Sequence, residues 1–225
     1  MAEFFDLHAI ADLAEAKMTD ELTLSAASKA YAGYMHEIRN RLDAINTMGV
    51  AQSNGRSILP SWQLDVESCF LNLRKVIELT FYASASAHSS LGVEIQRRIV
   101  AREWNARKVM REIEKVNPSF YPVPIEKALS EDGILRTVPR MSGFLAKEEC
   151  LHLYDEVCGA ALHASRDRAW YAREEYRLEA VNRWHNRIHH LLSHHWIQLR
   201  EDIAFAVILH LKGSDGIQVA PMQRC

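Results

Sequence analysis

The sequence lacks any apolar segment that is long enough to cross a membrane. Its richest apolar stretch, residues 76–87, is short and contains Glu78, whereas a spanning helix needs about 20 predominantly apolar residues. The first residues, Met1 to Asp6, include acidic side chains and lack the basic segment that opens a secretory signal peptide. We therefore expect a soluble, cytoplasmic protein with no part in a membrane.

Cysteine is scarce, and its positions follow no metal-binding or redox spacing. Cys69, Cys150 and Cys158 lie in helical patterns, Cys225 is the last residue, and no CxxC pair is present. Cysteines so spaced are typical of reduced thiols in a cytoplasmic protein and not of a disulfide framework.

The common motifs for nucleotide binding and hydrolysis are absent, and the net charge is small. We find no G-x-x-x-x-G-K-[ST], no G-x-G-x-x-G and no G-x-S-x-G. The formal net charge of the 225 residues is −2, so nucleic acid must be bound locally if it is bound at all. Because 48% of the residues are hydrophobic, the chain can build a core without disulfides or metal, and we expect no cofactor.

Apolar residues recur at helical spacing along most of the chain. In the first such segment, intervals of four and three residues separate Tyr31, Met35, Ile38, Leu42 and Ile45, which places them on one face of an amphipathic helix. Similar intervals recur in four later segments. The pattern predicts helices from a cap at residues 19–21 to about residue 50, and over about residues 61–89, 93–116, 145–164 and 169–200.

The Pro-rich segment 117–143 interrupts this pattern. Four of the six prolines lie between Pro118 and Pro139, and proline both ends helices and favours extended backbone. We predict an ordered loop here, with a short strand over residues 134–138.

The periodicity changes from helix to strand near the C-terminus. Apolar side chains alternate over residues 203–211, residues 213–216 supply a Gly-containing turn, and residues 217–219 begin a return strand. We therefore predict one mainly α-helical domain over residues 1–225. It consists of a bundle of about five or six helices over residues 1–200, which includes the loop 117–143, and a C-terminal β-hairpin over residues 202–221.

The most unusual segment is a run of arginines and histidines in the last predicted helix, where five of the eleven histidines lie within eleven residues. The simplest interpretation is a polar helix face with one hydrogen-bonded core histidine, His195, in the apolar stripe. A second interpretation is a metal site, in which His185/His189 and His190/His194 each provide two ligands four residues apart. The run lacks the third ligand that a tight site needs, so we predict no metal site.

A third interpretation pairs arginine with histidine on the helix face opposite to the apolar stripe. Arg183 and His190 are seven residues apart, as are Arg187 and His194, so each pair is offset by only about 20° around a helix. An imidazole can move the proton of a ribose 2′-hydroxyl, and a fixed guanidinium can stabilise the charge on the phosphoryl oxygens. These four side chains are our candidate catalytic residues.

Both pairs also match the motif Arg-x(4 to 6)-His, so the chain resembles the HEPN (higher eukaryotes and prokaryotes nucleotide-binding) superfamily. The resemblance rests on Arg183-x6-His190 and Arg187-x6-His194 in a late helix of a helical protein. It implies a homodimer whose two motifs face each other across a cleft. Many members are metal-independent ribonucleases of toxin–antitoxin and antiviral systems, whereas others only bind nucleotides or partners.

A second resemblance covers the middle of the chain. Residues 64–78 and 114–124 look like segments of a group of bacterial proteins to which no activity is assigned. This resemblance points to a bacterial protein but implies no function.

Cations in the predicted 93–116 helix are a candidate RNA-contacting patch. They are interleaved with acids such as Glu103 and Glu112, so a solvated helix of mixed charge is the alternative. The candidate RNA-binding residues are Arg97, Arg98, Arg102, Arg107 and Lys108.

Two further features have both a structural and a functional interpretation. Glu67, Arg74 and Glu78 share one stripe of the 61–89 helix and form either an interhelical ion-pair network or an acid–base set. His163 ends a predicted helix and is either its C-terminal cap or a site residue.

The leading hypothesis is a homodimeric, metal-independent HEPN-like protein that cleaves or binds RNA, in bacterial defence or a toxin–antitoxin system as the resemblance implies. The alternative is a non-catalytic module that binds a protein partner through the hairpin edge or an apolar helix face. A second alternative is a His-rich, metal-binding helical protein.

Overall fold

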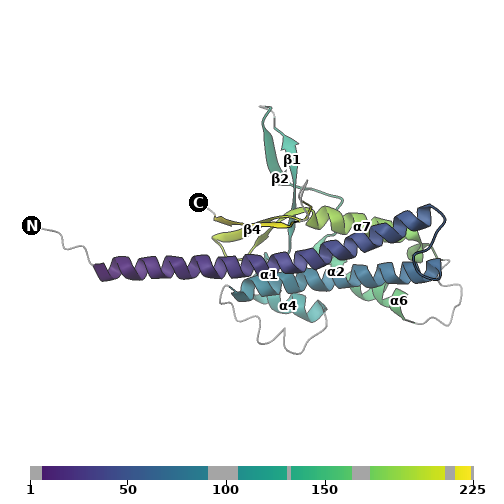
Figure 1. Ribbon diagram of the computed structural model, residues 1–225, viewed down its shortest axis with the longest axis horizontal. Coiled ribbons are helices and arrows are strands. Elements are labelled where there is room, and N and C mark those ends of the chain that lie inside the picture. The colour runs from purple at the N-terminus through teal and green to yellow at the C-terminus, as the bar shows by residue number, and fades with distance from the viewer. Residues whose placement is uncertain (1–6, 91–105, 131–132, 164–172, 211–215, 224–225) are drawn as a thin grey trace, which may run out of the picture.

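The computed structural model describes residues 7–90, 106–130, 133–163, 173–210 and 216–223. The fold is mainly α-helical, as predicted, and its strands form one five-stranded sheet in place of the isolated C-terminal hairpin that we expected. Two long helices, α1 (Leu7–Ser53) and α2 (Trp62–Ser90), lie side by side between the sheet and the shorter helices (Figure 1). Within the described ranges, no helix is both long and apolar enough to span a membrane.

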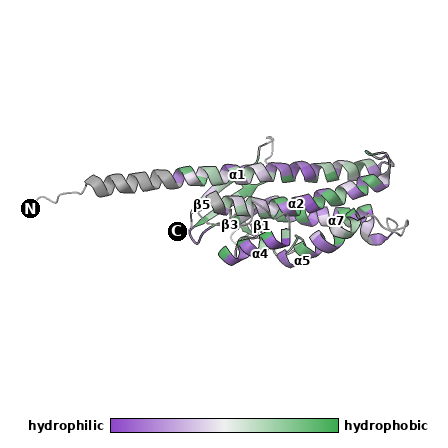
Figure 2. Ribbon diagram, turned by 90° about the horizontal axis from the view of Figure 1, so that it is seen from below, coloured by the Kyte–Doolittle hydropathy of each residue, from purple (hydrophilic) through white to green (hydrophobic). Residues whose placement is uncertain are grey.

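The apolar stripe predicted for the first helix forms the centre of the core. Tyr31, Met35, Ile38, Leu42 and Ile45 are each no more than 1% exposed, and they belong to the same core as the buried face of α2. Each such side chain stabilises the fold by about 1.5–3 kcal/mol when it is removed from water. Hydrophilic residues are distributed along the outer side of α1 (Figure 2).

The predicted cap at residues 19–21 is wrong, because α1 begins at Leu7 and continues through these residues. Residues 7–18 are rich in alanine and also contain leucine, glutamate, lysine and methionine, all of which favour helix. No Gly or Pro interrupts them. The N-terminal end of α1 therefore extends beyond the rest of the fold (Figure 1).

The connection between α1 and α2 is held by a glycine and a buried carboxylate. Gly55 has a φ of +68°, and its N–H donates to the carbonyl oxygen of Gln52 at 2.9 Å, as in a glycine C-terminal cap. Asp65, which is fully buried, accepts hydrogen bonds from the backbone N–H groups of Ile58 and Leu59 at 3.0 and 2.8 Å. These contacts set the return of the chain into α2.

Shorter helical elements cover the other side of α2 (Figure 1): α4 (Ala106–Val116), α5 (Lys147–His152), the π-helical segment η1 (Leu153–Val157) and α6 (Cys158–Leu162). The last three are continuous and confirm the helix predicted over residues 145–164. Residues 93–105 of the helix predicted over 93–116 lie outside the described ranges. Cys69, Cys150 and Cys158 are free thiols in this helical part, and burial raises the pKa of each to about 12.

The sheet lies against α1, where the Ser28 hydroxyl donates to the carbonyl oxygen of Val219 at 3.2 Å. All neighbouring strands are antiparallel, in the order β2-β1-β3-β4-β5. The strands are β1 (Val123–Leu129), β2 (Leu135–Pro139), β3 (His194–Gln198), β4 (Ile203–Ile208) and β5 (Gln218–Gln223).

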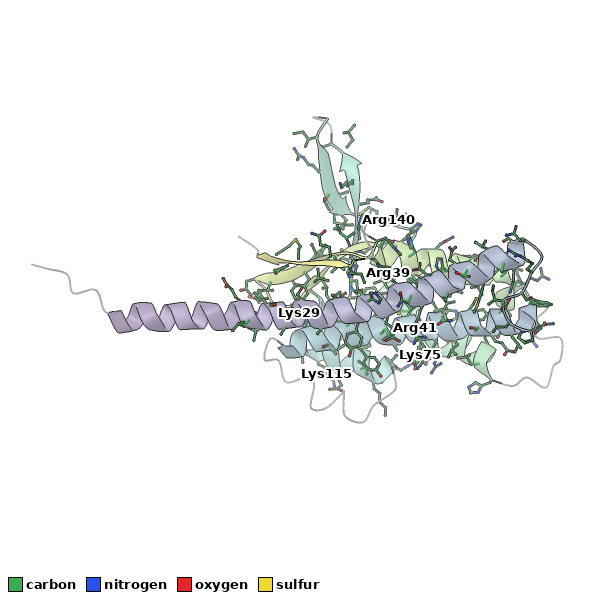
Figure 3. All side chains as sticks on the ribbon, in the orientation of Figure 1. Lys29, Arg39, Arg41, Lys75, Lys115 and Arg140 are labelled. Atoms are coloured by element: carbon green, nitrogen blue, oxygen red, sulfur yellow. The ribbon has the colours of Figure 1, made fainter. Side chains whose placement is uncertain are left out.

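The segment 117–143 contains a β-hairpin where we predicted a loop. Strand β2 confirms the short strand predicted over residues 134–138, but β1 pairs with it, and Gly133 turns the chain with a φ of +75°. Only Val123 and Pro124 of β1 pair with β3. The rest of this hairpin, residues 125–130 and 133–139, projects from the body (Figure 1), and we call it the hairpin arm. Arg140 lies at its foot (Figure 3).

The helix predicted over residues 169–200 is wrong at both ends. After the short 3-10 helix η3 (Glu174–Tyr176), helix α7 extends from Leu178 to Leu192, and the chain then enters β3. Alternate residues from His195 to Leu199 are buried, and β3 pairs with β4 along its whole length. Strand pairing with β4 therefore overrides the local helical pattern after Leu192.

The predicted C-terminal hairpin is confirmed as strands β4 and β5, which are paired from Ile203↔Gln223 to Ile208↔Gln218. Its predicted apolar face is buried against the helices, because Ile203, Phe205, Val207 and Leu209 are at most 6% exposed.

Candidate active site at the end of helix α7

Arg187, a predicted catalytic residue, is occupied by contacts within the chain. Its guanidinium donates to the carbonyl oxygen of Phe144 at 3.1 Å, forms an ion pair with Glu149, and lies 5.3 Å from the centre of the Trp184 ring. The hydrogen bond from Arg187 holds the pKa of Glu149 below its usual value. Arg187 thus ties α7 to the start of α5.

The other predicted pair does not form a pocket of its own. His190 Nδ1 lies 2.9 Å from the carbonyl oxygen of Gly143, to which it donates, on the same side of α7 as Arg187. Arg183 is exposed to solvent.

The predicted juxtaposition of Arg187 and His194 on one helix face is wrong. Since α7 ends at Leu192, His194 is the first residue of β3 and does not follow the helical turn of Arg187. The offset of about 20° around a helix, from which we paired Arg187 with His194, therefore does not apply.

His195 is the hydrogen-bonded core histidine that the simplest interpretation predicted. It is fully buried, its Nδ1 donates to the carbonyl oxygen of Leu192 at 2.9 Å, and its Nε2 accepts from the Tyr31 hydroxyl at 2.8 Å. Burial lowers the pKa of His195 to about 4 and raises the pKa of Tyr31. His195 is therefore neutral near pH 7 and joins β3 to α1.

Four other histidines line one solvent-open cavity between α1, the end of α7 and the sheet. The cavity has a volume of about 470 Å³, within the range of about 300–1,000 Å³ that is usual for small-ligand sites. We call it the histidine cavity. Its lining residues are Leu42, Asp43, Asn46, His185, Asn186, His189, Ser193, His194 and His210.

His189 lies at the centre of this cluster. Its ring stacks with those of His185 and His210, at centroid distances of 6.2 and 5.6 Å, and the ring of His190 lies edge-on at 6.3 Å. Burial, together with the neighbouring histidines, lowers the pKa of His189, and Asp43 opposes this shift. His189 is therefore a neutral imidazole near pH 7, which is the form that accepts a proton.

Two hydrogen bonds position the histidine rings. His185 Nε2 lies 3.2 Å from the carbonyl oxygen of Leu42 and donates to it, which joins α7 to α1. The Ser193 hydroxyl donates to the carbonyl oxygen of His189, and its oxygen lies 3.0 Å from His189 Nδ1. A serine beside a histidine is a nucleophile in some hydrolases. Here its proton is held by the helix backbone, as is common for serine in helices, so we assign Ser193 a positioning role.

The histidine pairs considered as metal ligands are not arranged around a common point. The rings of His185 and His189 are stacked with only 20° between their planes. In the part of the chain that the structure describes, no three His, Cys, Asp or Glu side chains are placed to hold a metal ion.

A larger cavity of about 760 Å³ lies beside the end of α4, lined by residues that include His88, Asn117, Trp196 and Arg200. His88 is fully buried, and both ring nitrogens are bonded, Nδ1 to the Ser84 carbonyl oxygen at 2.7 Å and Nε2 to the Asn117 amide at 2.7 Å. Burial lowers the pKa of His88. The histidine that lines this larger cavity is thus neutral, and both of its ring nitrogens are hydrogen-bonded within the chain. We therefore favour the smaller histidine cavity as the reactive site.

Only part of the predicted RNA-contacting patch can be placed. Arg97, Arg98 and Arg102 lie outside the described residues. Arg107 forms an ion pair with Asp155 in η1, and Lys108 is exposed on α4. Arg107 therefore helps to hold α4 against the π-helical segment.

Two members of the predicted polar stripe of α2, Arg74 and Glu78, have the structural role that we considered. Arg74 pairs with Glu78 at 3.6 Å, stacks 3.9 Å from the centre of the Tyr154 ring and donates to the Tyr154 carbonyl oxygen. The Tyr154 hydroxyl in turn donates to Glu78 at 3.0 Å. This network joins α2 to η1. His163 is the C-terminal cap residue of α6.

The sequence reasoning missed two members of the histidine cavity, Asp43 and His210. Asp43 was one of several polar residues on α1, and His210 stood at an outward position of a predicted strand. His210 directly follows β4. A histidine just beyond a predicted strand was the sequence signal that could have marked His210 as a site residue, because the loops that follow strands often carry such residues.

Comparison with known proteins adds no relative. No family model matches the chain, no curated protein is significantly similar to it, and no solved structure matches its fold.

Proposed function

We propose that this protein cleaves RNA without a metal ion, and that the reaction takes place in the histidine cavity. The observation that carries the proposal is the gathering of His185, His189, His194 and His210 around one solvent-open cavity. Several imidazoles around one cavity provide both the base and the acid that a phosphodiester transfer needs.

His189 is the base in this reaction. It takes the proton of the ribose 2′-hydroxyl, the 2′-oxygen attacks phosphorus, and the bond from phosphorus to the 5′-oxygen breaks. A protonated imidazole, His210 or His194, gives its proton to the leaving 5′-oxygen. The products are a 2′,3′-cyclic phosphate and a 5′-hydroxyl, and no co-reactant is consumed.

The choice of RNA rests on the chemistry of the cavity and on the HEPN resemblance. RNA carries its own nucleophile, so two proton transfers are sufficient for its cleavage. The proposal keeps His194 from the predicted set. It replaces Arg187, Arg183 and His190, which lie outside the cavity lining, with His189 and His210.

The test is cleavage of mixed cellular RNA in the presence of a chelator. We expect His189→Ala to reduce the rate by about 10²–10⁴-fold, the usual contribution of a general base. His152→Ala is the matched control, because it removes an exposed imidazole on α5 that lies outside the cavity lining. An inert wild type, or equal cleavage by wild type and His189→Ala, would contradict the proposal. Activity that chelator abolishes would favour the metal-binding alternative.

A second candidate function is the non-catalytic partner-binding module, and the hairpin arm favours it. Leu129 and Ile134, at the far end of the arm, are 72% and 55% exposed, and a two-stranded hairpin gains stability from a surface that covers it. Crosslinking of the wild type and of Leu129→Ser in cell extract tests this. A partner that is lost only in the variant, together with an RNA-inert wild type, would favour the module.

We also propose a homodimer, as the HEPN resemblance implies, and a cytoplasmic location, as the spacing of the cysteines suggests. Trp184 and Arg187 of α7 contact each other within the chain, whereas Arg183 and His190 are exposed on α7 and are available to a second copy of the chain. Size-exclusion chromatography with light scattering should return twice the mass of the chain, and a monomer at tens of micromolar would contradict the dimer.

A further inference from the structure

A small cavity adjoins the histidine cavity at the root of the hairpin arm, and we call it the fork pocket. Its volume is about 140 Å³, the space of roughly five water molecules, so it admits a single ring or one apolar side chain. His194 lines both cavities, so the two meet at this residue. The proposed reaction gives the fork pocket no role.

The fork pocket forms where β1 separates from β3. Pro124 is the last residue of β1 that pairs with β3, and it lies opposite His195. In an antiparallel pair the next residue, Ile125, then comes beside His194. Beyond this point the arm projects from the sheet (Figure 1), and residues of the arm and of β4 line the angle between them.

One face of the sheet supplies the side chains that line the pocket. Side chains alternate along a strand, and the register places Lys127 opposite Thr137 and His194 opposite Ile208. Pro124 and His195 are buried, so their neighbours along each strand belong to the face away from the core. Six lining residues share this outer face: Ile125, Lys127, Thr137, His194, Ala206 and Ile208.

The pocket combines an apolar floor with an uncompensated cation. The apolar lining residues of β1 and β4 form the floor. The carboxylate of Glu126 also lines the pocket, but it is paired with Arg140 at 3.0 Å, at the foot of the arm (Figure 3). Lys127 is exposed and forms no ion pair or hydrogen bond with any described residue. It stands about 7 Å further along β1 than Ile125, so its ammonium lies at the rim.

We propose that the fork pocket binds a nucleotide, whose heterocyclic ring lies on the apolar floor and whose phosphate is bound by Lys127. Removing the ring from water stabilises the complex, and an ammonium is a phosphate ligand. The identity of the natural ligand rests on the proposed function. In that reaction the nucleotide belongs to RNA and is the neighbour of the phosphodiester that reacts in the histidine cavity, because the two cavities meet at His194.

The experiment is a titration of the full-length protein with two probes, adenosine 5′-monophosphate and a 5′-phosphorylated 2′-deoxy dinucleotide. The dinucleotide lacks the 2′-hydroxyl, so the proposed reaction cannot cleave it. We expect both probes to shift the NMR signals of the methyl groups of Ile125 and Ile208. The dinucleotide should bind more tightly, because it reaches both cavities, and it should also shift the signals of His194.

Two variants separate the cation from the floor. Lys127→Gln should weaken binding of the dinucleotide by about tenfold, the usual effect of one hydrogen bond to a charged group. It should also reduce the slope of log K against log salt concentration by about 0.7, the value for one phosphate of a single strand. Ala206→Leu fills the floor and should weaken binding to a similar extent without a change in this slope.

Arg136→Gln is the matched control. It removes one positive charge from the same arm, but Arg136 pairs with Ala128 and so belongs to the opposite face. It should bind the dinucleotide as the wild type does. Equal losses in Lys127→Gln and Arg136→Gln would mean that only the general charge of the arm attracts the probe, and would overturn the inference.

Two further results would overturn it: no binding of either probe by the wild type, or equal binding by the wild type and a folded Lys127→Gln. A nucleotide-inert wild type with a protein partner that Ala206→Leu loses would assign the pocket to protein. Thermal melting identifies any variant that fails to fold, and Lys127→Gln, at an exposed position, keeps the test decisive if Ala206→Leu does so.

The cleavage assay distinguishes this inference from the proposed function. If both hold, Lys127→Gln should raise KM for RNA and leave kcat unchanged, because the contact is equal in the ground state and the transition state. Probe binding through Lys127 by a protein that cleaves no RNA would refute the proposed function and leave the nucleotide site intact. RNA cleavage with an unchanged KM in both Lys127→Gln and Ala206→Leu would do the reverse.

Discussion

The buried histidines and the cavity histidines differ in what their ring nitrogens contact. In His88 and His195, Nδ1 donates to a carbonyl oxygen and Nε2 accepts from a side-chain donor, so one neutral tautomer is fixed. In the cavity, His189 contacts the rings of His185 and His210 and the Ser193 hydroxyl oxygen, and it lines solvent-open space. Burial in the core lowers the pKa of His195, and the cavity lowers the pKa of His189. Only the cavity leaves an imidazole where it can exchange a proton with a ligand. Histidine content alone therefore does not locate a candidate reactive site, whereas several imidazoles around one solvent-open cavity do.

The largest expected effect on stability comes from removing a buried ring. His195→Ala leaves a cavity and an unpaired Tyr31 hydroxyl in the core, so we expect the free energy of unfolding to fall by about 3–5 kcal/mol. Urea denaturation measures this loss. An equal loss of stability in His189→Ala, in the open cavity, would contradict the distinction between buried and cavity histidines.

The next effect is a dependence of stability on pH. In the unfolded chain His195 titrates near the usual pKa of about 6.5, whereas its pKa in the folded protein is about 4. Between these values the unfolded chain binds more protons, so stability rises with pH. The contribution of His195 is complete above about pH 6.5 and is lost as the pH falls towards about 4, by about 3 kcal/mol in total.

Urea denaturation between pH 4 and 7 tests this linkage. His195→Gln should flatten the slope, and His210→Gln, at an exposed position, should keep it. A slope that is unchanged in His195→Gln would mean that other groups cause the pH dependence. His88, whose pKa is also lowered by burial, is the first of these to examine.

A smaller effect is expected from removing one hydroxyl. Tyr31→Phe keeps the ring that packs edge-on against Phe205 but leaves Nε2 of His195 without its donor. An unsatisfied buried acceptor costs about 1–3 kcal/mol. Thermal melting should place this variant between the wild type and His195→Ala, and an unchanged melting temperature would show that the bond contributes nothing.

The smallest effect should come from the rim of the cavity. His210 is exposed, so His210→Gln should change the free energy of unfolding by no more than about 0.5 kcal/mol. If His210 is the general acid of the proposed reaction, the same variant should alter the alkaline limb of the pH–rate profile of RNA cleavage, because a general acid must be protonated to act. A large loss of stability would place His210 with the structural histidines.

Elements with one uninterrupted period were predictable from the sequence. The stripe from Tyr31 to Ile45 and the alternation from Ile203 to Leu209 each offer a single face to bury, and both are buried. The end of α7 was not predictable in this way. His195 fits the helical stripe of Ile188 and Leu191, and it equally fits the alternation that continues after it. Pairing with β4, which no local pattern reveals, decides in favour of the strand.

The candidate site was only partly predictable for a related reason. The sequence pointed to His194 because it stands in a conspicuous run. Asp43 and His210 meet it only because α1 and the end of β4 pack against α7.

The contacts between the first helix and the last strands have a consequence for synthesis. Tyr31 meets His195 across 164 residues of sequence, and Ser28 meets Val219 across 191. At about 5–20 residues per second, a ribosome needs roughly 10–30 s to make the first of these partners after Tyr31. During that interval α1 and α2 can pair, but the sheet-facing flank of α1 has no cover. A nascent chain that stalls before β3 is therefore an intermediate in which one apolar flank of α1 is exposed. Exposed apolar surface of this kind binds chaperones and promotes aggregation.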